Sequence, residues 1–241
     1  MENVFLPFIV AVFISLILTP LVRKLAIRIG AVDIPKDNRR VHKKPIPLIG
    51  GLAIYLSIII TSLIFLNIDK TLVSILIGGS LILISGLIDD IKELSPKGKL
   101  IFQIASALVL IVADVKIDAI TNPFGRAGTV IPLNGLSIPL TIFWVVGITN
   151  TLNLIDGLDG LAAGVTLIAS LSFFAVAGKF NYISIMLMSA ILAGACLGFL
   201  PYNFNPAKIF MGDTGALFLG FMLAAISIEG VMKSVATIAV V

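Results

Sequence analysis

The chain has 241 residues, of which 59% are hydrophobic and only 12% are charged, and its formal charge is +4 at pH 7. Globular domains carry about 25% charged residues, so this composition excludes an ordinary soluble protein. The single cysteine, Cys196, and the single histidine, His42, exclude a disulfide framework, a thiolate metal site and a histidine-rich metal centre.

The apolar segments predict an all-α polytopic membrane protein with one domain over residues 1–241. A helix needs about 20 apolar residues to span a bilayer. Eight segments fit, at residues 4–22, 47–66, 71–88, 100–115, 136–151, 160–178, 182–200 and 214–232. A ninth span is expected to begin near Val235 and to be cut off at Val241. The first residues have no basic stretch and no small-residue cleavage site, so we expect a first span and not a signal peptide.

The basic residues predict which loops face the cytoplasm. The loops after spans one, three, five and seven hold twelve of the 17 Lys and Arg residues, and the other loops and ends hold five. The positive-inside rule therefore places the first group in the cytoplasm and the N-terminus outside. Among the outer loops, residues 121–139 contain Asn134-Gly135 between short apolar stretches, which predicts a small hairpin with a type I′ turn and no chemistry.

Four polar clusters interrupt the apolar sequence, and all of them fall on the predicted cytoplasmic side. They are residues 39–51, 86–100, 153–160 and 203–215. Because charged residues at membrane depth are costly and rare, they usually mark a functional site. Four clusters on one face predict a single composite site at the inner membrane surface.

Asp89 and Asp90 form an adjacent pair at the end of the third predicted span. Neighbours on a helix point about 100° apart, so we expect the two carboxylates to have different partners. The alternative is a solvated helix end, in which Asp89, Asp90 and nearby charges only mark the membrane boundary. Lys99 has a similar alternative as an ordinary anchor at the inner face.

Asp156 and Asp159 stand among leucines together with Asn153. Their spacing of three residues would place both aspartates on one face of a helix. Gly157 and Gly160 favour an irregular loop that a ligand can approach closely. A simple Asp-Gly turn between two spans is the alternative, but it accounts for only one of the two aspartates.

Asp213 and Thr214 precede the eighth predicted span. Both residue types are favoured as helix N-caps, and a helix N-terminus also suits phosphate or a phosphate-bound metal, so the two interpretations are compatible. Asn203 and Asn205 are typical of a turn. The basic segment 39–51 is also typical of attraction to anionic lipid headgroups, which does not exclude a phosphorylated substrate.

Carboxylates, lysines and glycines gathered at one membrane face indicate phosphoryl transfer. Mg²⁺ prefers oxygen ligands and is usually held by one or two carboxylates together with substrate phosphates. A protein that transfers phosphoryl groups must position its substrates and neutralise their charge. A secondary transporter is an alternative, but the sequence has no convincing inverted repeat and its charges stand at span ends, not at the midplane.

Three motifs in order resemble the polyprenyl-phosphate N-acetylhexosamine-1-phosphate transferases: DDIKELSPKGKL (89–100), NLIDGLDGLA (153–162) and FMGDTG (210–215). The resemblance covers residues 15–232. It implies transfer of a sugar 1-phosphate from a UDP-sugar to undecaprenyl phosphate in the bacterial cell membrane, with Mg²⁺ or Mn²⁺ and release of UMP. The products begin the synthesis of peptidoglycan, teichoic acid or surface polysaccharides.

The resemblance also implies roles for individual residues. Asp213 matches the principal metal ligand, with Asp156 beside it, and Asp89 and Asp90 match the pair assigned to the lipid phosphate and catalysis. The central loop (Asn153, Asp156, Gly157, Leu158 and Asp159) is expected near the uridine and the catalytic face. The remaining substrate contacts are expected from Lys43 or its neighbour Lys44, Lys99, Asn203 and Phe210.

The segment HKKPIPLIGG (42–51) is closer to the branch of the family that uses UDP-N-acetylglucosamine than to the muramoyl-pentapeptide branch. Family members have about ten or eleven spans and a later histidine-containing loop, so the chain is expected to be truncated. An inactive fragment or a non-catalytic assembly partner is therefore an alternative. No nucleic acid is expected as a partner, and the resemblance is compatible with a homodimer.

Overall fold

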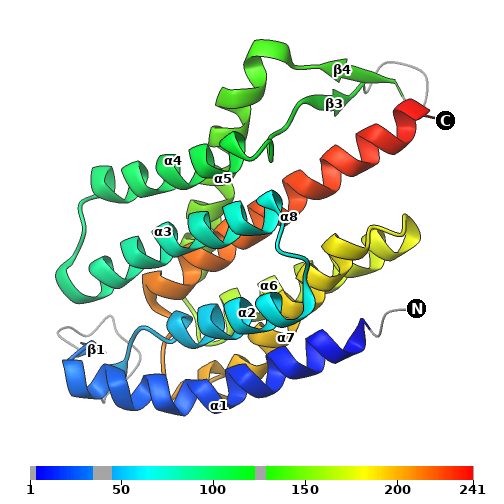
Figure 1. Cartoon of the computed structure of the whole chain (residues 1–241). Coiled ribbons are helices and arrows are strands. Elements are labelled where there is room, and N and C mark those ends of the chain that lie inside the picture. Colours follow the sequence, from blue (N-terminus) through cyan, green and yellow to red (C-terminus); the bar gives the residue numbers. More distant parts are fainter. Residues whose placement is uncertain (1–3, 35–44, 123–128, 241) are drawn as a thin grey trace.

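The computed structural model describes residues 4–34, 45–122 and 129–240, which are mainly helical. The α-helices are α1 (Phe5–Ile29), α2 (Gly51–Phe65), α3 (Lys70–Lys92), α4 (Pro96–Val112), α5 (Ser137–Ile155), α6 (Leu161–Lys179), α7 (Ile183–Asn203) and α8 (Gly212–Val240). They form one elongated bundle (Figure 1). This architecture confirms the prediction of an all-α membrane protein.

Six segments of the described chain are long and apolar enough to cross a membrane, so the predicted count of eight spans is not confirmed. The two exceptions are α2, with 15 residues, and α4, with 17. Helix α2 begins only at Gly51 because Ile46 and Pro47 form a strand. Helix α4 begins at Pro96, with Ser95 as its N-cap, and ends at Val112, so its charged first turn uses part of its length.

The predicted ninth span near Val235 is wrong as a separate element. Helix α8 continues without a break through Lys233 to Val240. A charged residue shows where an apolar stretch ends, but it does not interrupt the backbone hydrogen bonds of a helix. The same reason explains why α3 continues past the predicted end of its span and includes Asp89 and Asp90 in its last turn.

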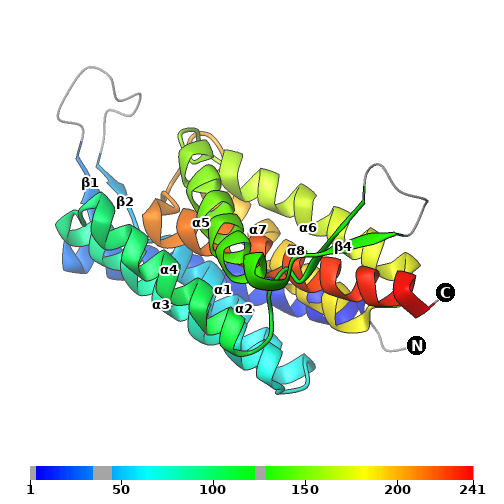
Figure 2. The same ribbon diagram turned by 90° about the horizontal axis from the view of Figure 1, so that it is seen from above.

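Two short antiparallel hairpins lie at opposite ends of the bundle (Figure 2). Strand β1 (Val32–Asp33) pairs with β2 (Ile46–Pro47), and β3 (Ala119–Thr121) pairs with β4 (Val130–Pro132). A hairpin therefore exists in this part of the chain, but the predicted hairpin around Asn134-Gly135 is wrong. Asn134-Gly135 follows β4 and belongs to the short 3-10 helix η1 (Asn134–Leu136), where it leads into α5.

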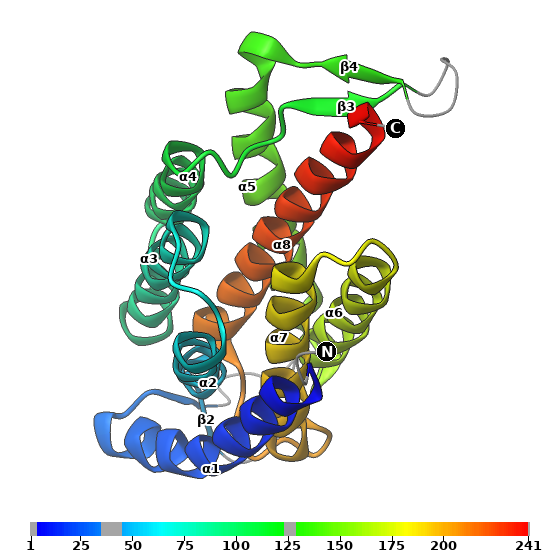
Figure 3. The ribbon, with the colours of Figure 1, turned by 45° about the vertical axis from the view of Figure 1, so that its right-hand side comes forward.

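Helix α8 runs through the middle of the bundle (Figure 3). It contacts α2, α3, α5, α6 and α7. Residues in consecutive positions along it are buried, including Leu217, Phe218 and Leu219. A helix that is hydrophobic on all sides is stable only inside a protein or membrane, which accounts for its central place.

The start of α8 is held by close backbone contacts. Gly50 and Gly51 donate backbone hydrogen bonds of 2.9 Å to the carbonyls of Phe210 and Met211. A Cβ atom on Gly51 would lie 2.1 Å from the Cα atom of Gly215, and one on Gly86 would lie 2.5 Å from the Cα atom of Thr214. Helices α2 and α3 can therefore approach the first turn of α8 only because both positions are glycine.

Candidate active site

The described parts of the polar clusters meet at one end of the bundle, around a pocket of about 620 Å³. The loops α3–α4, α5–α6 and α7–α8 all lie at this end, because the helices between them cross the bundle in alternating directions (Figure 1). The pocket is lined by nine of the predicted site residues: Asp90, Asn153, Asp156, Gly157, Leu158, Asp159, Asn203, Phe210 and Asp213. Lys43 and Lys44 lie outside the described residues.

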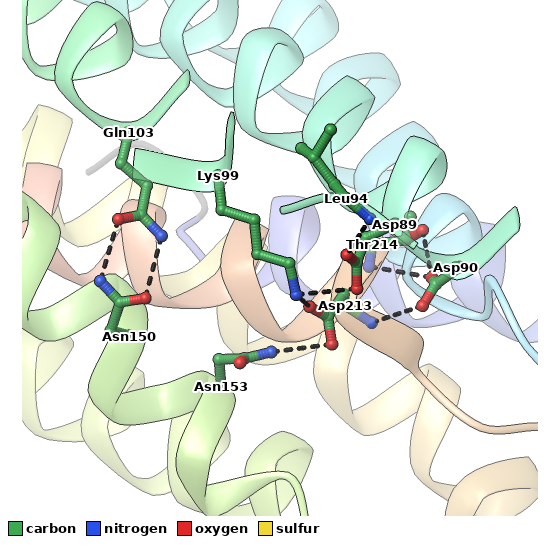
Figure 4. Close-up of polar contacts among 9 residues, drawn as sticks. All are labelled: Asp89, Asp90, Leu94, Lys99, Gln103, Asn150, Asn153, Asp213 and Thr214. Carbon is green, nitrogen blue, oxygen red and sulfur yellow. Dashed lines mark hydrogen bonds and ion pairs between the residues drawn. The ribbon is translucent and has the colours of Figure 1, made fainter. Parts of the chain in front are cut away.

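Asp213 is the residue on which the clusters converge (Figure 4). Its Oδ2 atom is 2.5 Å from the Lys99 ammonium on α4, and its Oδ1 atom accepts a hydrogen bond of 3.0 Å from the Asn153 amide on α5. The Lys99 ammonium also lies 2.8 Å from the Asp89 carboxylate on α3. Four helices therefore supply side chains to one ionic cluster.

Asp90 caps α8 from the neighbouring helix α3. Its carboxylate accepts hydrogen bonds from the backbone nitrogens of Asp213 and Thr214 at 2.9 and 3.0 Å, and from the Thr214 hydroxyl at 2.6 Å. The first N–H groups of a helix lack partners within the helix, and an acidic group there is favoured by the helix dipole. The predicted N-cap thus exists, but α3 provides it.

Asp89 points to other partners than Asp90, as predicted from their adjacent positions. Besides its ion pair with Lys99, it accepts a hydrogen bond of 2.8 Å from the backbone nitrogen of Leu94, which closes the turn between α3 and α4. The alternative of a merely solvated helix end does not fit, because both carboxylates are partly buried and have specific partners.

The acidic residues fit a divalent metal ion. Asp89, Asp90 and Asp213 each offer a carboxylate oxygen, and these oxygens lie within 4.8 Å of one another. Carboxylate oxygens are the ligands that Mg²⁺ prefers. Asp156 does not belong to this group of three.

Asp156 lies in the loop between α5 and α6, and its carboxylate makes no hydrogen bond or ion pair with any described residue. Burial, and after it the nearby charges of Asp213, Asp90 and Asp159, together raise its pKa to about 7. Because a buried polar group normally has a partner, this carboxyl is available to a ligand.

The raised pKa of Asp156 predicts that the metal-free protein loses stability as the pH rises. The pKa in the folded state is above its unfolded value, so the contribution is fully present below about pH 4 and is lost as the pH passes about 7. Between pH 6 and 8 the loss is on the order of 1 kcal/mol. Thermal unfolding in detergent with a chelator should show a fall in Tm that is smaller in the Asp156→Asn variant.

The matched control for this experiment is Asp114→Asn. Asp114 is exposed, and its ion pairs with Lys70 and Lys116 lower its pKa, so it stays charged between pH 6 and 8. This variant should keep the fall in Tm of the wild-type protein. An equal fall in the wild-type protein and in Asp156→Asn would contradict the assignment.

Asn203 and Asp159 brace the wall of the pocket. The buried amide of Asn203 accepts a hydrogen bond of 3.1 Å from the Gly160 nitrogen and donates one of 3.1 Å to the Ile209 carbonyl. Asp159 accepts hydrogen bonds from the Asn205 side chain and the Ala207 nitrogen, at 3.1 and 3.0 Å. The α5–α6 loop is thereby tied to the segment that carries Phe210.

The sequence interpretation missed two polar residues next to the site, Gln103 and Asn150. They lie inside predicted apolar spans, where polar residues are rare. Gln103 is four residues from Lys99, and Asn150 is three residues from Asn153. Helical spacing of this kind places each on the same face as a site residue, and this signal was available in the sequence.

Residues 72–231 of the chain match the model of glycosyl transferase family 4. The whole chain is 40% identical to a protein of Bacillus subtilis called probable undecaprenyl-phosphate N-acetylglucosaminyl 1-phosphate transferase, and it covers 67% of that protein. Over 90% of its length it is 41% identical to the decaprenyl-phosphate N-acetylglucosaminephosphotransferase of Mycobacterium tuberculosis, of which it covers 58%.

A phospho-N-acetylmuramoyl-pentapeptide-transferase of Halalkalibacterium halodurans is 37% identical over 92% of the chain, which covers 72% of that relative. The chain thus spans between about three fifths and three quarters of the length of these three relatives. The aligned region includes all four polar clusters of the sequence. The chain belongs to glycosyl transferase family 4, among the polyprenyl-phosphate N-acetylhexosamine-1-phosphate transferases that its motifs resemble.

Proposed function

We propose that the protein transfers N-acetylglucosamine 1-phosphate, or a related amino-sugar 1-phosphate, from its UDP-sugar to undecaprenyl phosphate and releases UMP. The observation that carries this proposal is the convergence of Lys99, Asn153 and Asp89 on Asp213 beside a pocket. The relative that matches over the whole chain, the Bacillus subtilis protein, carries N-acetylglucosaminyl 1-phosphate transferase in its name, and this supports the choice of sugar.

The reaction is a direct displacement at phosphorus. An oxygen of the lipid phosphate bonds to the β-phosphorus of the UDP-sugar, and the bond from that phosphorus to the bridging oxygen of UMP breaks. A phosphate monoester has a second pKa near 6, so the nucleophile is largely deprotonated at neutral pH without a strong base. The main obstacle is the repulsion between an anionic nucleophile and an anionic diphosphate.

The residues of the site supply the charge that this reaction needs. Asp213, with Asp89 and Asp90, would hold Mg²⁺, which would supply positive charge against the substrate phosphates. The Lys99 ammonium adds a fixed positive charge beside the same carboxylates. Groups already oriented toward developing charge stabilise a transition state without rearrangement. The carboxyl of Asp156 has no partner among the described residues, and we assign it to contact with the substrate or with the ligands around the metal.

The pocket walls are assigned to the nucleotide and the sugar. Asn153, Gly157, Leu158 and Phe210 face the pocket and offer a polar amide, an open backbone and apolar surface. Leu158 is 68% exposed, which suits a position where lipid and aqueous substrate meet. The polar end of the bundle is assigned to the cytoplasmic side on the charge distribution of the loops, with the N-terminus outside.

Membranes from cells that express the chain at its full natural length test this function. With Mg²⁺, undecaprenyl phosphate and UDP-N-acetylglucosamine, we expect release of UMP and formation of a lipid-linked sugar in equal amounts. Omission of the lipid phosphate or addition of a chelator should stop both products. UMP release without a lipid-linked product would contradict the proposal, and a different UDP-amino-sugar as the better donor would revise the sugar only.

A further inference from the structure

An amide pair connects α4 and α5 beside the ionic cluster (Figure 4). The Gln103 side chain donates a hydrogen bond of 3.0 Å to the Asn150 side chain, and Asn150 returns one of 2.9 Å. The Asn150 amide also donates to the Val146 carbonyl of its own helix at 2.8 Å. Gln103 is 1% exposed, so the pair is closed to water on the α4 side.

Gln103 and Asn150 lie on the same helix faces as Lys99 and Asn153, the two residues that donate to Asp213. Gln103 lies one turn along α4 from Lys99, and Asn150 lies one turn along α5 from Asn153. Lys99 and Asn153 hold opposite oxygens of the Asp213 carboxylate. Two sets of polar contacts therefore connect α4 with α5: the amide pair directly, and Lys99 and Asn153 through Asp213.

Two reciprocal hydrogen bonds fix the relative position of the two helices more strictly than apolar contacts at this place would. Apolar side chains pack against each other in several relative positions, whereas paired amides require one register of the two helices. Buried polar pairs are known to fix register in helical assemblies. A shift of α4 along α5 would move Lys99 relative to Asn153, and the two side chains could then no longer hold the two oxygens of Asp213 in the same way.

We propose that Gln103 and Asn150 are positioning residues, which set the orientation of the Asp213 carboxylate by fixing α4 against α5. This inference rests on the proposed function, in which Asp213 holds the metal. Neither residue lines the pocket, and the side chains that donate to Asp213 are Lys99 and Asn153, so the amide pair acts through these two residues. Loss of a residue that orients a metal ligand typically costs 10–100-fold in metal affinity or activity.

The test compares Gln103→Leu, Asn150→Leu and the exchanged variant Gln103→Asn with Asn150→Gln, which keeps one long and one short amide. We measure kcat and KM for UDP-N-acetylglucosamine, and, separately, binding of Mn²⁺ by electron paramagnetic resonance without substrate. Each single variant should weaken Mn²⁺ binding and lower kcat by about tenfold, with little change in KM. The exchanged variant should recover most of both losses.

Ser106→Ala is the matched control. Ser106 is also buried on α4, and its hydroxyl donates only to the Phe102 carbonyl of its own helix at 2.9 Å. This variant should keep the Mn²⁺ affinity and kcat of the wild-type protein. Thermal unfolding in detergent identifies any variant that does not fold. If a single variant does not fold, the Mn²⁺ affinity and kcat of the exchanged variant test the inference.

Unchanged Mn²⁺ affinity in folded Gln103→Leu and Asn150→Leu would overturn the inference and leave the proposed function intact. Losses that the exchanged variant does not recover, or equal losses in Ser106→Ala, would also overturn it. A wild-type protein that neither binds Mn²⁺ nor releases UMP would overturn the proposed function, and this inference with it.

Discussion

Replacing Asp213 with asparagine is expected to lower the rate of UMP release by about 10²-fold or more. Asparagine has nearly the same shape and retains an oxygen that can accept the hydrogen bond from Asn153. It lacks the negative charge that pairs with Lys99 and that a divalent cation requires. The variant should therefore fold, yet bind Mn²⁺ much more weakly than the wild-type protein. The measurements are UMP release, Mn²⁺ binding and Tm in detergent.

The control for Asp213→Asn is Asp114→Asn, which removes the same charge from an exposed position near Lys70 and Lys116. Its activity should equal that of the wild-type protein. Turnover in Asp213→Asn at the wild-type rate would contradict the assignment of Asp213 to the metal. If Asp213→Asn loses activity because it unfolds, the measurements are repeated with Asp213→Glu, which keeps the charge and lengthens the side chain.

Replacing Gly51 with alanine is expected to destabilise the protein by about 1–3 kcal/mol and to reduce activity at the same time. The new Cβ atom would lie 2.1 Å from the Cα atom of Gly215 and 2.2 Å from its nitrogen, so α2 and α8 must move apart. Both contacts are with backbone, which cannot turn away as a flexible side chain can. The separation of α2 and α8 would also move the first turn of α8, which carries Asp213.

Gly164→Ala is the control for this substitution, because a Cβ atom there would meet nothing within 4 Å. In a helix interior alanine is favoured over glycine by about 0.5–1 kcal/mol, so this variant should be at least as stable as the wild-type protein. Gly86→Ala should behave like Gly51→Ala, since its Cβ atom would approach the Cα atom of Thr214 to 2.5 Å. Wild-type Tm in Gly51→Ala would show that the two helices are not held in this close contact.

Some features of the fold and site were accessible from the sequence because they depend on local composition. Apolar segments of about 20 residues identify helices that lipid can accept, and this led to the correct class of fold. Alternation of the spans then placed the described parts of the clusters around Asp89, Asp156 and Asp213 at one end of the bundle. The different partners of Asp89 and Asp90 followed from the geometry of a single helix.

The boundaries of the elements were less accessible, because they depend on contacts between segments. Helix α2 is shorter than its apolar stretch since Ile46 and Pro47 pair with β1. The predicted turn at Asn134-Gly135 was displaced because β4 ends at Pro132 and the chain turns directly into α5. Hydropathy measures the affinity of a segment for lipid, and neither of these contacts changes it.

By itself, then, the sequence determined the class of fold, the shared location of the polar clusters and the chemical types at the site, since each follows from the spacing of residues along one segment. Only the tertiary structure decided which partners those residues have. Asp90 caps α8 from α3, Asn203 braces two loops, and Gln103 pairs with Asn150, and each contact joins residues that are far apart in the sequence. Such pairs depend on the relative register of packed helices, and register is set by close contacts such as Gly51 against Gly215.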